Sequence, residues 1–139
     1  TSNMSLLFKI HLFLSLYMTG LIWFVQVVHY PLMGRVGTER FTTYEQGHTR
    51  LTFWVTAPPM LLELATGIAL LCFSPFSVVF QVNLAGIVLL WASTFFVQVP
   101  LHNQLSEAFR SSAHRRLMNT NWVRTVLWTG RGIVLLVVA

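Results

Sequence analysis

Four histidines flank long apolar stretches of the sequence. His29 and His102 each end such a stretch, whereas His48 and His114 each precede one. Imidazoles that face one another inside a helical bundle can bind a metal ion or a haem. These four residues are therefore candidate cofactor ligands, although polar residues at helix ends also serve as simple interfacial caps. The sequence has no close ligand pair such as His-Glu-x-x-His, so the cofactor stays open between none, a metal ion, a haem and another pigment.

Several amides and one arginine lie near the same ends of the apolar stretches as the histidines. Gln26 lies three residues before His29 and Gln98 lies four before His102, so each pair shares a helix face. The candidate ligand-binding residues are Gln26, Gln98, Asn103 and Asn121. Arg124, at the same end of the last apolar stretch, is a candidate catalytic residue.

Two further charges lie deep inside apolar stretches. Glu63 follows Leu51 by 12 residues and Arg131 follows Asn121 by 10, which at about 1.5 Å per residue places both near the middle of a membrane-spanning helix. A lone charge is costly there, so we expect the two side chains to contact each other. The pair could be a structural bridge between the second and fourth helices. Alternatively, Arg131 anchors an anionic or carbonyl group and Glu63 accepts a proton, which makes both candidate catalytic residues.

The composition decides the class of protein that must position these residues. Of 139 residues, 55% are hydrophobic and only 9% are charged, whereas a soluble domain of this size has roughly 25% charged residues. No formal charge occurs among the 25 residues between Lys9 and Arg35, or among the 43 between Glu63 and Glu107. Such a chain cannot cover a small soluble fold with polar groups. This excludes a soluble enzyme, a disordered tail and a nucleic-acid-binding module, despite the net charge of +5.

The sequence predicts an all-α integral membrane four-helix bundle that forms a single transmembrane domain over residues 1–139. Four stretches have the roughly 20 apolar residues needed to cross about 30 Å of hydrocarbon. They cover about residues 6–30, 51–73, 78–101 and 121–139. Pro58-Pro59 is expected to kink the second span or to open it locally. The two longer connections, over residues 31–50 and 102–120, are polar and predict short interfacial helices.

Short sequence matches indicate that the bundle consists of two duplicated helical hairpins. Phe-Val-Gln-Val at 24–27 recurs at 96–99, an offset of 72. The segment 48–51 recurs in part at 114–117, an offset of 66, and Thr52, Trp54 and Val55 recur 68 residues later. Because each unit contains two spans, the two copies would have parallel topology, related by an axis along the membrane normal.

Basic residues are concentrated in the two longer connections, which lie on one side of the membrane if there are four spans. They are Arg35, Arg40, Arg50, Arg110, Arg115 and Arg116. The positive-inside rule places both connections in the cytoplasm and both termini outside, as in a bacterial inner-membrane protein. The expected partners are the lipid bilayer, a hydrophobic small molecule, and other membrane proteins or further copies of the chain.

Three motifs next to the apolar stretches resemble a known family. They are Val28-x-x-Pro31-Leu32, Pro100-Leu101-x-Asn103-x-Leu105-Ser106 and Asn121-Trp122-x-Arg124. Together they are similar to a four-helix membrane family of unknown function that includes the anthrone oxygenases. The resemblance covers most of the chain in layout. It implies a polar role for Asn103 and Arg124 and, from some members, cofactor-free oxygenation of polyaromatic substrates. The chain departs from the family pattern at His102, inside the second motif.

Two functions remain open from the sequence. The first is an enzyme or binding protein whose polar site inside the membrane handles a hydrophobic small molecule, which by the resemblance would be an anthrone-oxygenase-like oxidoreductase. The second is a non-enzymatic subunit of a larger membrane complex, whose histidines ligate haem or a porphyrin-like pigment. The convergence of polar residues on one layer favours the first. An absorption spectrum with metal analysis distinguishes them, because a Soret or chlorin band supports the second.

Overall fold

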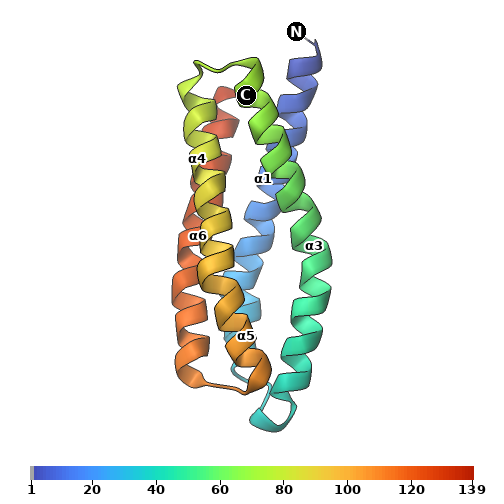
Figure 1. The fold of residues 1–139 in the computed structure, drawn as a ribbon, viewed down its shortest axis with the longest axis vertical. Coiled ribbons are helices and arrows are strands. Elements are labelled where there is room, and N and C mark those ends of the chain that lie inside the picture. The colour runs from blue at the N-terminus through green and yellow to red at the C-terminus, as the bar shows by residue number, and fades with distance from the viewer. Residues whose placement is uncertain (1) are drawn as a thin grey trace.

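The computed structural model describes residues 2–139, which form four long helical rods and no strand. The first rod joins α1 (Ser2–Phe24), a π-helical turn (Val25–His29) and α2 (Tyr30–Met33), and the second rod is α3 (Thr38–Phe73). The third joins α4 (Val78–Ser93), another π-helical turn (Thr94–Gln98) and α5 (Val99–Glu107), and the fourth is α6 (Ser111–Val138). Figure 1 shows the rods running alternately up and down, with both chain ends at the same end of the bundle.

The packing order of the rods determines which residues can meet in the core. α1 packs against α3 and α6, and α4 packs against the same two helices. The rods therefore form a ring in which α1 and α4 lie on one diagonal and α3 and α6 lie on the other. The predicted all-α four-helix bundle is confirmed. Side chains of diagonal helices can touch only by crossing the core.

The connections are shorter than the sequence suggested. Residues 34–37 and 108–110 join rods at one end, and residues 74–77 join the two middle rods at the other end. The expectation of long polar connections over 31–50 and 102–120 was wrong, because the rods continue through them with a buried apolar face that includes Phe41 and Leu105. Gly37, with φ of 89°, lies in the left-handed region just before α3, where glycine avoids strain. The Ser77 hydroxyl accepts a hydrogen bond from the Phe80 amide and caps α4.

Prolines distort the rods in different ways. α3 is helical through Pro58 and Pro59, and Figure 1 shows that this helix bends along its length. Pro31 and Pro100 each follow a π-helical turn by two residues, and both turns overlap a Phe-Val-Gln-Val segment. A proline lacks an N–H and its ring clashes with the preceding turn of an α-helix, so a wider π-turn accommodates it.

The interior of the bundle combines an apolar core with many polar side chains, and its exterior carries many large apolar residues. The buried polar and charged residues are His11, Ser15, Gln26, Glu45, Glu63, Asn83, Gln98, His114, Asn121, Arg124, Thr125 and Arg131. Large apolar side chains such as Phe13, Trp54, Phe96 and Val137 lie on the outside, each at least 68% exposed. A soluble four-helix bundle instead keeps its charged residues on the outside and exposes few large apolar ones. The apolar exterior and the buried polar groups are the features of the fold that a functional account must explain.

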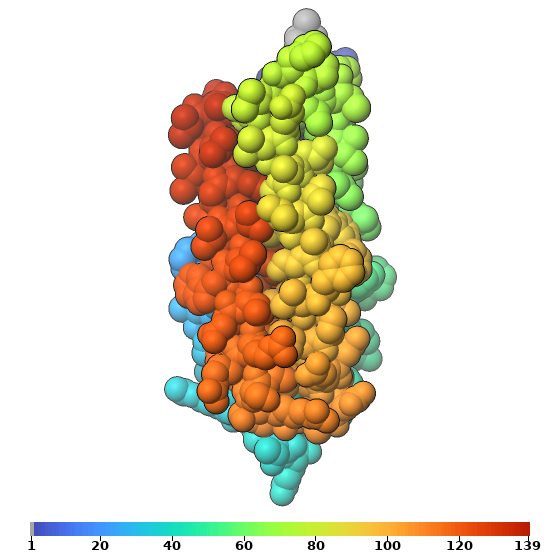
Figure 2. Space-filling model, turned by 60° about the vertical axis from the view of Figure 1, so that its left-hand side comes forward, coloured from blue at the N-terminus to red at the C-terminus, as the bar shows by residue number. Residues whose placement is uncertain are grey.

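Three of the rods are long and apolar enough to cross a membrane: Ser2–Met33, Thr38–Phe73 and Val78–Glu107. α6 is not in this set, and its apolar stretch is interrupted by Arg124 and Arg131. Figure 2 shows α6 and the rod of α4 and α5 lying side by side along one face of the molecule. α6 therefore packs along the same length of the bundle as its apolar neighbours.

Candidate functional site

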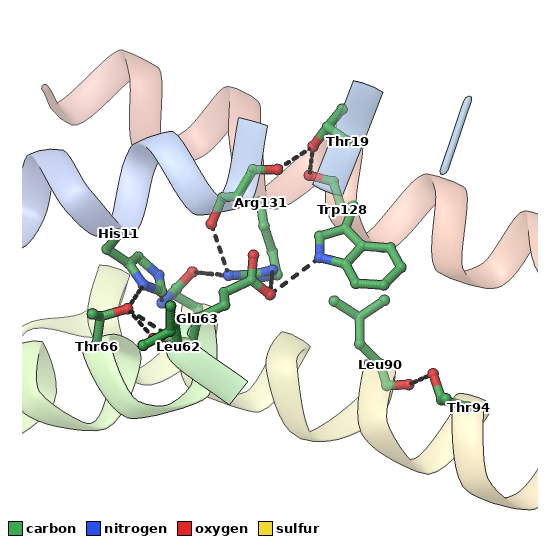
Figure 3. A network of polar contacts seen from close by, with 11 residues as sticks. His11, Thr19, Leu62, Glu63, Thr66, Leu90, Thr94, Trp128 and Arg131 are labelled. Carbon is green, nitrogen blue, oxygen red and sulfur yellow. Dashed lines mark hydrogen bonds and ion pairs between the residues drawn. The ribbon is translucent and has the colours of Figure 1, made fainter. Parts of the chain in front are cut away.

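The first polar layer of the core is built around Glu63 and Arg131. The Arg131 Nη1 atom donates to Glu63 Oε1 at 3.1 Å, and both side chains are almost completely buried. The predicted contact is therefore confirmed. It was expected between neighbouring helices, but α3 and α6 are diagonal, so the pair crosses the centre of the bundle (Figure 3).

Other rods complete the partners of this ion pair. Asn83 Oδ1 on α4 accepts from Arg131 Nε at 3.1 Å and from Nη2 at 2.9 Å, and Ser15 Oγ on α1 accepts from Nη2 at 3.3 Å. The Trp128 indole donates to Glu63 Oε1 at 3.1 Å (Figure 3). A Cβ atom on Gly86 would lie 2.6 Å from Arg131 Cδ, so glycine is needed where the arginine passes α4. The layer links all four rods through Arg131, whose charge is paired with Glu63 and hydrogen-bonded to Asn83 and Ser15.

His11 belongs to this layer as well. Asn83 Nδ2 donates to His11 Nε2 at 3.0 Å, so the other ring nitrogen carries the proton. That nitrogen, Nδ1, donates to Thr66 Oγ1 at 2.7 Å. Asn83 was missed as a candidate, and its signal was an amide side chain near the start of the third predicted span.

The second polar layer holds three of the four predicted histidines, at the end of the bundle that carries the 34–37 and 108–110 connections. His29 Nε2 and His48 Nδ1 lie 2.7 Å apart, with their rings stacked at 4.3 Å between centroids. The His48 and His102 rings are 5.3 Å apart. His114 is not bonded to the other three histidines. Its Nε2 atom donates instead to the Tyr30 carbonyl at 2.7 Å.

No group of three or more His, Cys, Asp and Glu side chains within residues 2–139 is arranged to hold a metal ion. The histidine nitrogens instead bond to protein groups. His48 Nδ1 is also 3.0 Å from the Thr52 hydroxyl, and both nitrogens of His102 are engaged. The layer is arranged as a hydrogen-bonded chain.

Glu45, His102 and Tyr30 form the continuous part of that chain. Glu45 Oε1 bonds to His102 Nδ1, and His102 Nε2 lies 2.9 Å from the Tyr30 hydroxyl. Glu45 is fully buried and Tyr30 is nearly so, whereas the His102 side chain is 13% exposed. An ionised Glu45 fixes the proton of His102 on Nδ1, which leaves Nε2 to accept the phenolic proton of Tyr30. A carboxylate, an imidazole and a phenol in this order can move a proton.

The sequence did not single out Tyr30 or Glu45 as site residues. Each residue nevertheless has a weak sequence feature that points to the histidine layer. Glu45 lies three residues before His48 and shares its helix face. Tyr30 precedes His102 by 72 residues, the offset of the Phe-Val-Gln-Val match.

The predicted amides contact α6 instead of lining an open pocket. Gln26 Nε2 donates to the Met118 carbonyl at 3.0 Å, and its Oε1 accepts from Asn121 at 2.9 Å and from Thr125 at 3.1 Å. Gln98 Nε2 donates to the Thr120 hydroxyl at 3.0 Å. Both glutamines, which lie in π-helical turns, thus hold α6 in place. The side chain of Asn103 is exposed on α5, outside this buried layer.

Arg124 lies between the two layers with few partners. Its Nη1 atom donates to Asn121 Oδ1 at 3.3 Å, and its guanidinium lies 5.2 Å from the centre of the Trp128 ring. Trp128 therefore contacts Glu63 through its nitrogen and Arg124 through its face. Four buried polar atoms of residues 2–139 have no hydrogen-bond partner: Glu45 Oε2, Glu63 Oε2, Gln98 Oε1 and Arg124 Nε.

A cavity of about 320 Å³ lies between α4 and α6, on the face shown in Figure 2. Its walls include Leu89, Leu127 and Val134, with Asn83 and Arg131 at its base. This volume is at the lower end of ligand-sized pockets. The cavity adjoins the Glu63 layer and is not lined by the histidines.

Comparison of the chain with models of known families, with characterised proteins and with solved structures finds no match. The resemblance to the anthrone-oxygenase family therefore remains a prediction from its motifs.

Proposed function

We propose that the chain is an integral membrane protein of the bacterial inner membrane, with all four rods spanning the bilayer. The apolar exterior and the burial of charged and polar side chains inside the bundle support this, because lipid favours that arrangement and water does not. α6 is included as the fourth span because it packs against α1 and α4 and buries its arginines in the core. Both connections rich in arginine, 34–37 and 108–110 with their adjoining turns, would face the cytoplasm.

We further propose that the bundle consists of two duplicated hairpins related by a pseudo-two-fold axis along its length. Three core contacts support it, because each joins residues separated by a repeat offset. Glu63 and Arg131 are 68 residues apart. His11 and Asn83 are 72 apart, as are Tyr30 and His102. An axis of this kind brings equivalent positions together across the diagonals, where these pairs meet.

The function that the site supports best is acid–base chemistry on a hydrophobic small molecule at the Glu45–His102–Tyr30 chain. The observation that carries this proposal is the pairing of each member with the next inside a buried layer. A base that is oriented by a carboxylate and bonded to a hydroxyl is the arrangement that activates that hydroxyl. The bonds from both His102 nitrogens to Glu45 and Tyr30 favour this role of His102 over haem ligation, because a ligating nitrogen must point at the iron.

The resemblance suggests oxygenation of a polyaromatic substrate as the reaction. Tyr30 oxygen would take the proton of an acidic C–H group while its own proton passes to His102 Nε2, and Glu45 would stabilise the resulting imidazolium. The electron pair left on the substrate forms an enolate that dioxygen oxidises. For anthrone the balance is one anthrone and one dioxygen giving one anthraquinone and one water. Arg124 would stabilise the enolate oxygen, and Glu63 and Arg131 would hold the four rods together.

The test is anthrone oxidation by the purified chain in lipid nanodiscs, measured as oxygen uptake and anthraquinone formation. We expect a rate above the spontaneous one, and a loss of about 10²–10⁴-fold in the catalysed rate for His102→Gln. Gln104→Ala, an exposed change two residues away, should leave the rate unchanged. A wild-type rate equal to the spontaneous rate contradicts the oxygenase proposal.

A further inference from the structure

The two buried arginines of α6 differ sharply in their partners. Arg131 bonds to a carboxylate, an amide oxygen and a hydroxyl. Arg124 is equally buried, at 7% exposed, yet it has one hydrogen bond of 3.3 Å, and its Nε atom has none. The ion pairs within residues 2–139 are Glu45–His102 and Glu63–Arg131, so Arg124 has no acidic partner.

A buried guanidinium without a counter-charge is unfavourable. The desolvation of its charge is offset only when opposite charge or several hydrogen bonds replace water. The groups around Arg124 are neutral: they are the Asn121 amide, the Trp128 ring and the Tyr30 hydroxyl, which lies beside the guanidinium. The one nearby carboxylate of this layer, Glu45, directs its bonded oxygen to His102. Stability alone therefore gives no reason for a charge at this position.

We propose that Arg124 is the anchor for an anionic oxygen of the ligand, such as a carboxylate, phenolate or enolate on an apolar body. The aromatic body of the ligand rests on the proposed function. The negative charge of the ligand is inferred from Arg124 alone. Gln98, whose Nε2 atom bonds to Thr120 about one helical turn before Arg124, has a buried and unpartnered Oε1 atom that can accept a hydrogen bond from a hydroxyl. The ligand class is thus an apolar acid that carries a single negative charge at one edge.

The first measurement needs no ligand, because the proposal predicts opposite effects of two similar substitutions. Arg124→Met removes an unpaired charge and should raise the unfolding temperature of the full chain in detergent by several degrees. Arg131→Met leaves Glu63 buried without its partner and should lower it. Arg116→Met, an exposed change on the same helix, should have little effect. A lower unfolding temperature for Arg124→Met shows that the protein itself satisfies this charge, and overturns the proposal.

The second measurement uses two probes that differ in charge, anthracene-9-carboxylate and anthracene-9-methanol, followed by their fluorescence in nanodiscs. Wild type and Arg116→Met should bind the carboxylate at least tenfold more tightly than the alcohol. The preference should disappear in Arg124→Met and persist in Arg124→Lys, which keeps the charge. Equal binding of the two probes by the wild type, or a preference unchanged in Arg124→Met, overturns the anion site.

The experiments distinguish a failure of the oxygenase proposal from a failure of the anion-site proposal. A charge preference that depends on Arg124 without any anthrone oxidation supports the anion site and contradicts the oxygenase. Anthrone oxidation that is sensitive to His102, with no effect of Arg124 on binding or stability, contradicts the anion site alone.

Discussion

The residues at the centre of the bundle are paired so that each charge depends on its partner. Removing Glu63 leaves Arg131 buried with only neutral groups, namely Asn83 and Ser15. Breaking a buried ion pair from one side typically costs about 3–5 kcal/mol, whereas replacing both members costs less. The pair is therefore expected to be strongly coupled in stability.

A double-mutant cycle with Glu63→Gln and Arg131→Gln tests this coupling. We expect each single change to destabilise the protein by about 3–5 kcal/mol, and the double change to cost clearly less than the sum. The measurement is the unfolding free energy in detergent. The exposed residues Glu39 and Arg40, changed in the same way, serve as the control. Additive losses at 63 and 131 would show that each charge is satisfied by other groups.

Sequence reasoning placed these charges correctly, but it could not assign their full set of partners. Counting residues along apolar stretches gives depth, so the contact of Glu63 with Arg131 could be predicted. Depth does not tell which helices are diagonal, so the contact of His11 with Asn83 across the core could not be predicted. The histidines could be predicted as site residues from their residue type. The contact of Tyr30 with His102 could not, because Tyr30 directly follows a π-helical turn, which changes the direction of the side chains after it. Such a turn has no clear sequence signal beyond the proline after it.

At the scale of elements, the close approach of α4 and α6 depends on one glycine. A Cβ atom at Gly86 would lie 2.6 Å from Arg131 Cδ, and the side-chain stem there is held by bonds at its far end. Gly130 lies on the facing helix and lines the same cavity, but a Cβ atom there would meet nothing within 4 Å. The two glycines therefore offer a matched comparison.

We expect Gly86→Ala to destabilise the bundle by about 1–3 kcal/mol through overpacking. Gly130→Ala should be neutral or stabilising by up to about 1 kcal/mol, because alanine favours the helix. Thermal unfolding of both variants in the same detergent gives the comparison. Equal effects of the two changes would mean that α4 can move away from Arg131 without loss.

Helix boundaries also show what the sequence could and could not predict. The spans were found because their apolar runs are long, and four rods resulted. The connections were overestimated because polar residues outside a membrane look like loops when only hydropathy is considered. Phe41 and Leu105 instead continue a helical apolar face that packs beyond the apolar spans.

At the scale of the whole molecule, the positions of the connections make a prediction about orientation. Arg40 and Arg115 lie at the end with the 34–37 and 108–110 connections, and Cys72 lies near the opposite end. We expect cysteines at 40 and 115, each introduced with Cys72→Ala, to resist an impermeant thiol reagent on intact cells. Both should react once the membrane is opened. Labelling of either from outside reverses the orientation, and unlike results for the two would contradict the four-span arrangement.

The weak hydropathy of α6 has a consequence for how the protein is made. Synthesis delivers the three strongly apolar rods first, and α6, with Arg124 and Arg131 in its apolar stretch, leaves the ribosome after them. A helix with two central arginines enters lipid poorly by itself. In the proposed membrane protein, Glu63 and Asn83 would then be in the bilayer before Arg131 arrives. α6 would insert against helices that already hold the partners of Arg131, so that its insertion would be a folding step as much as a translocation step.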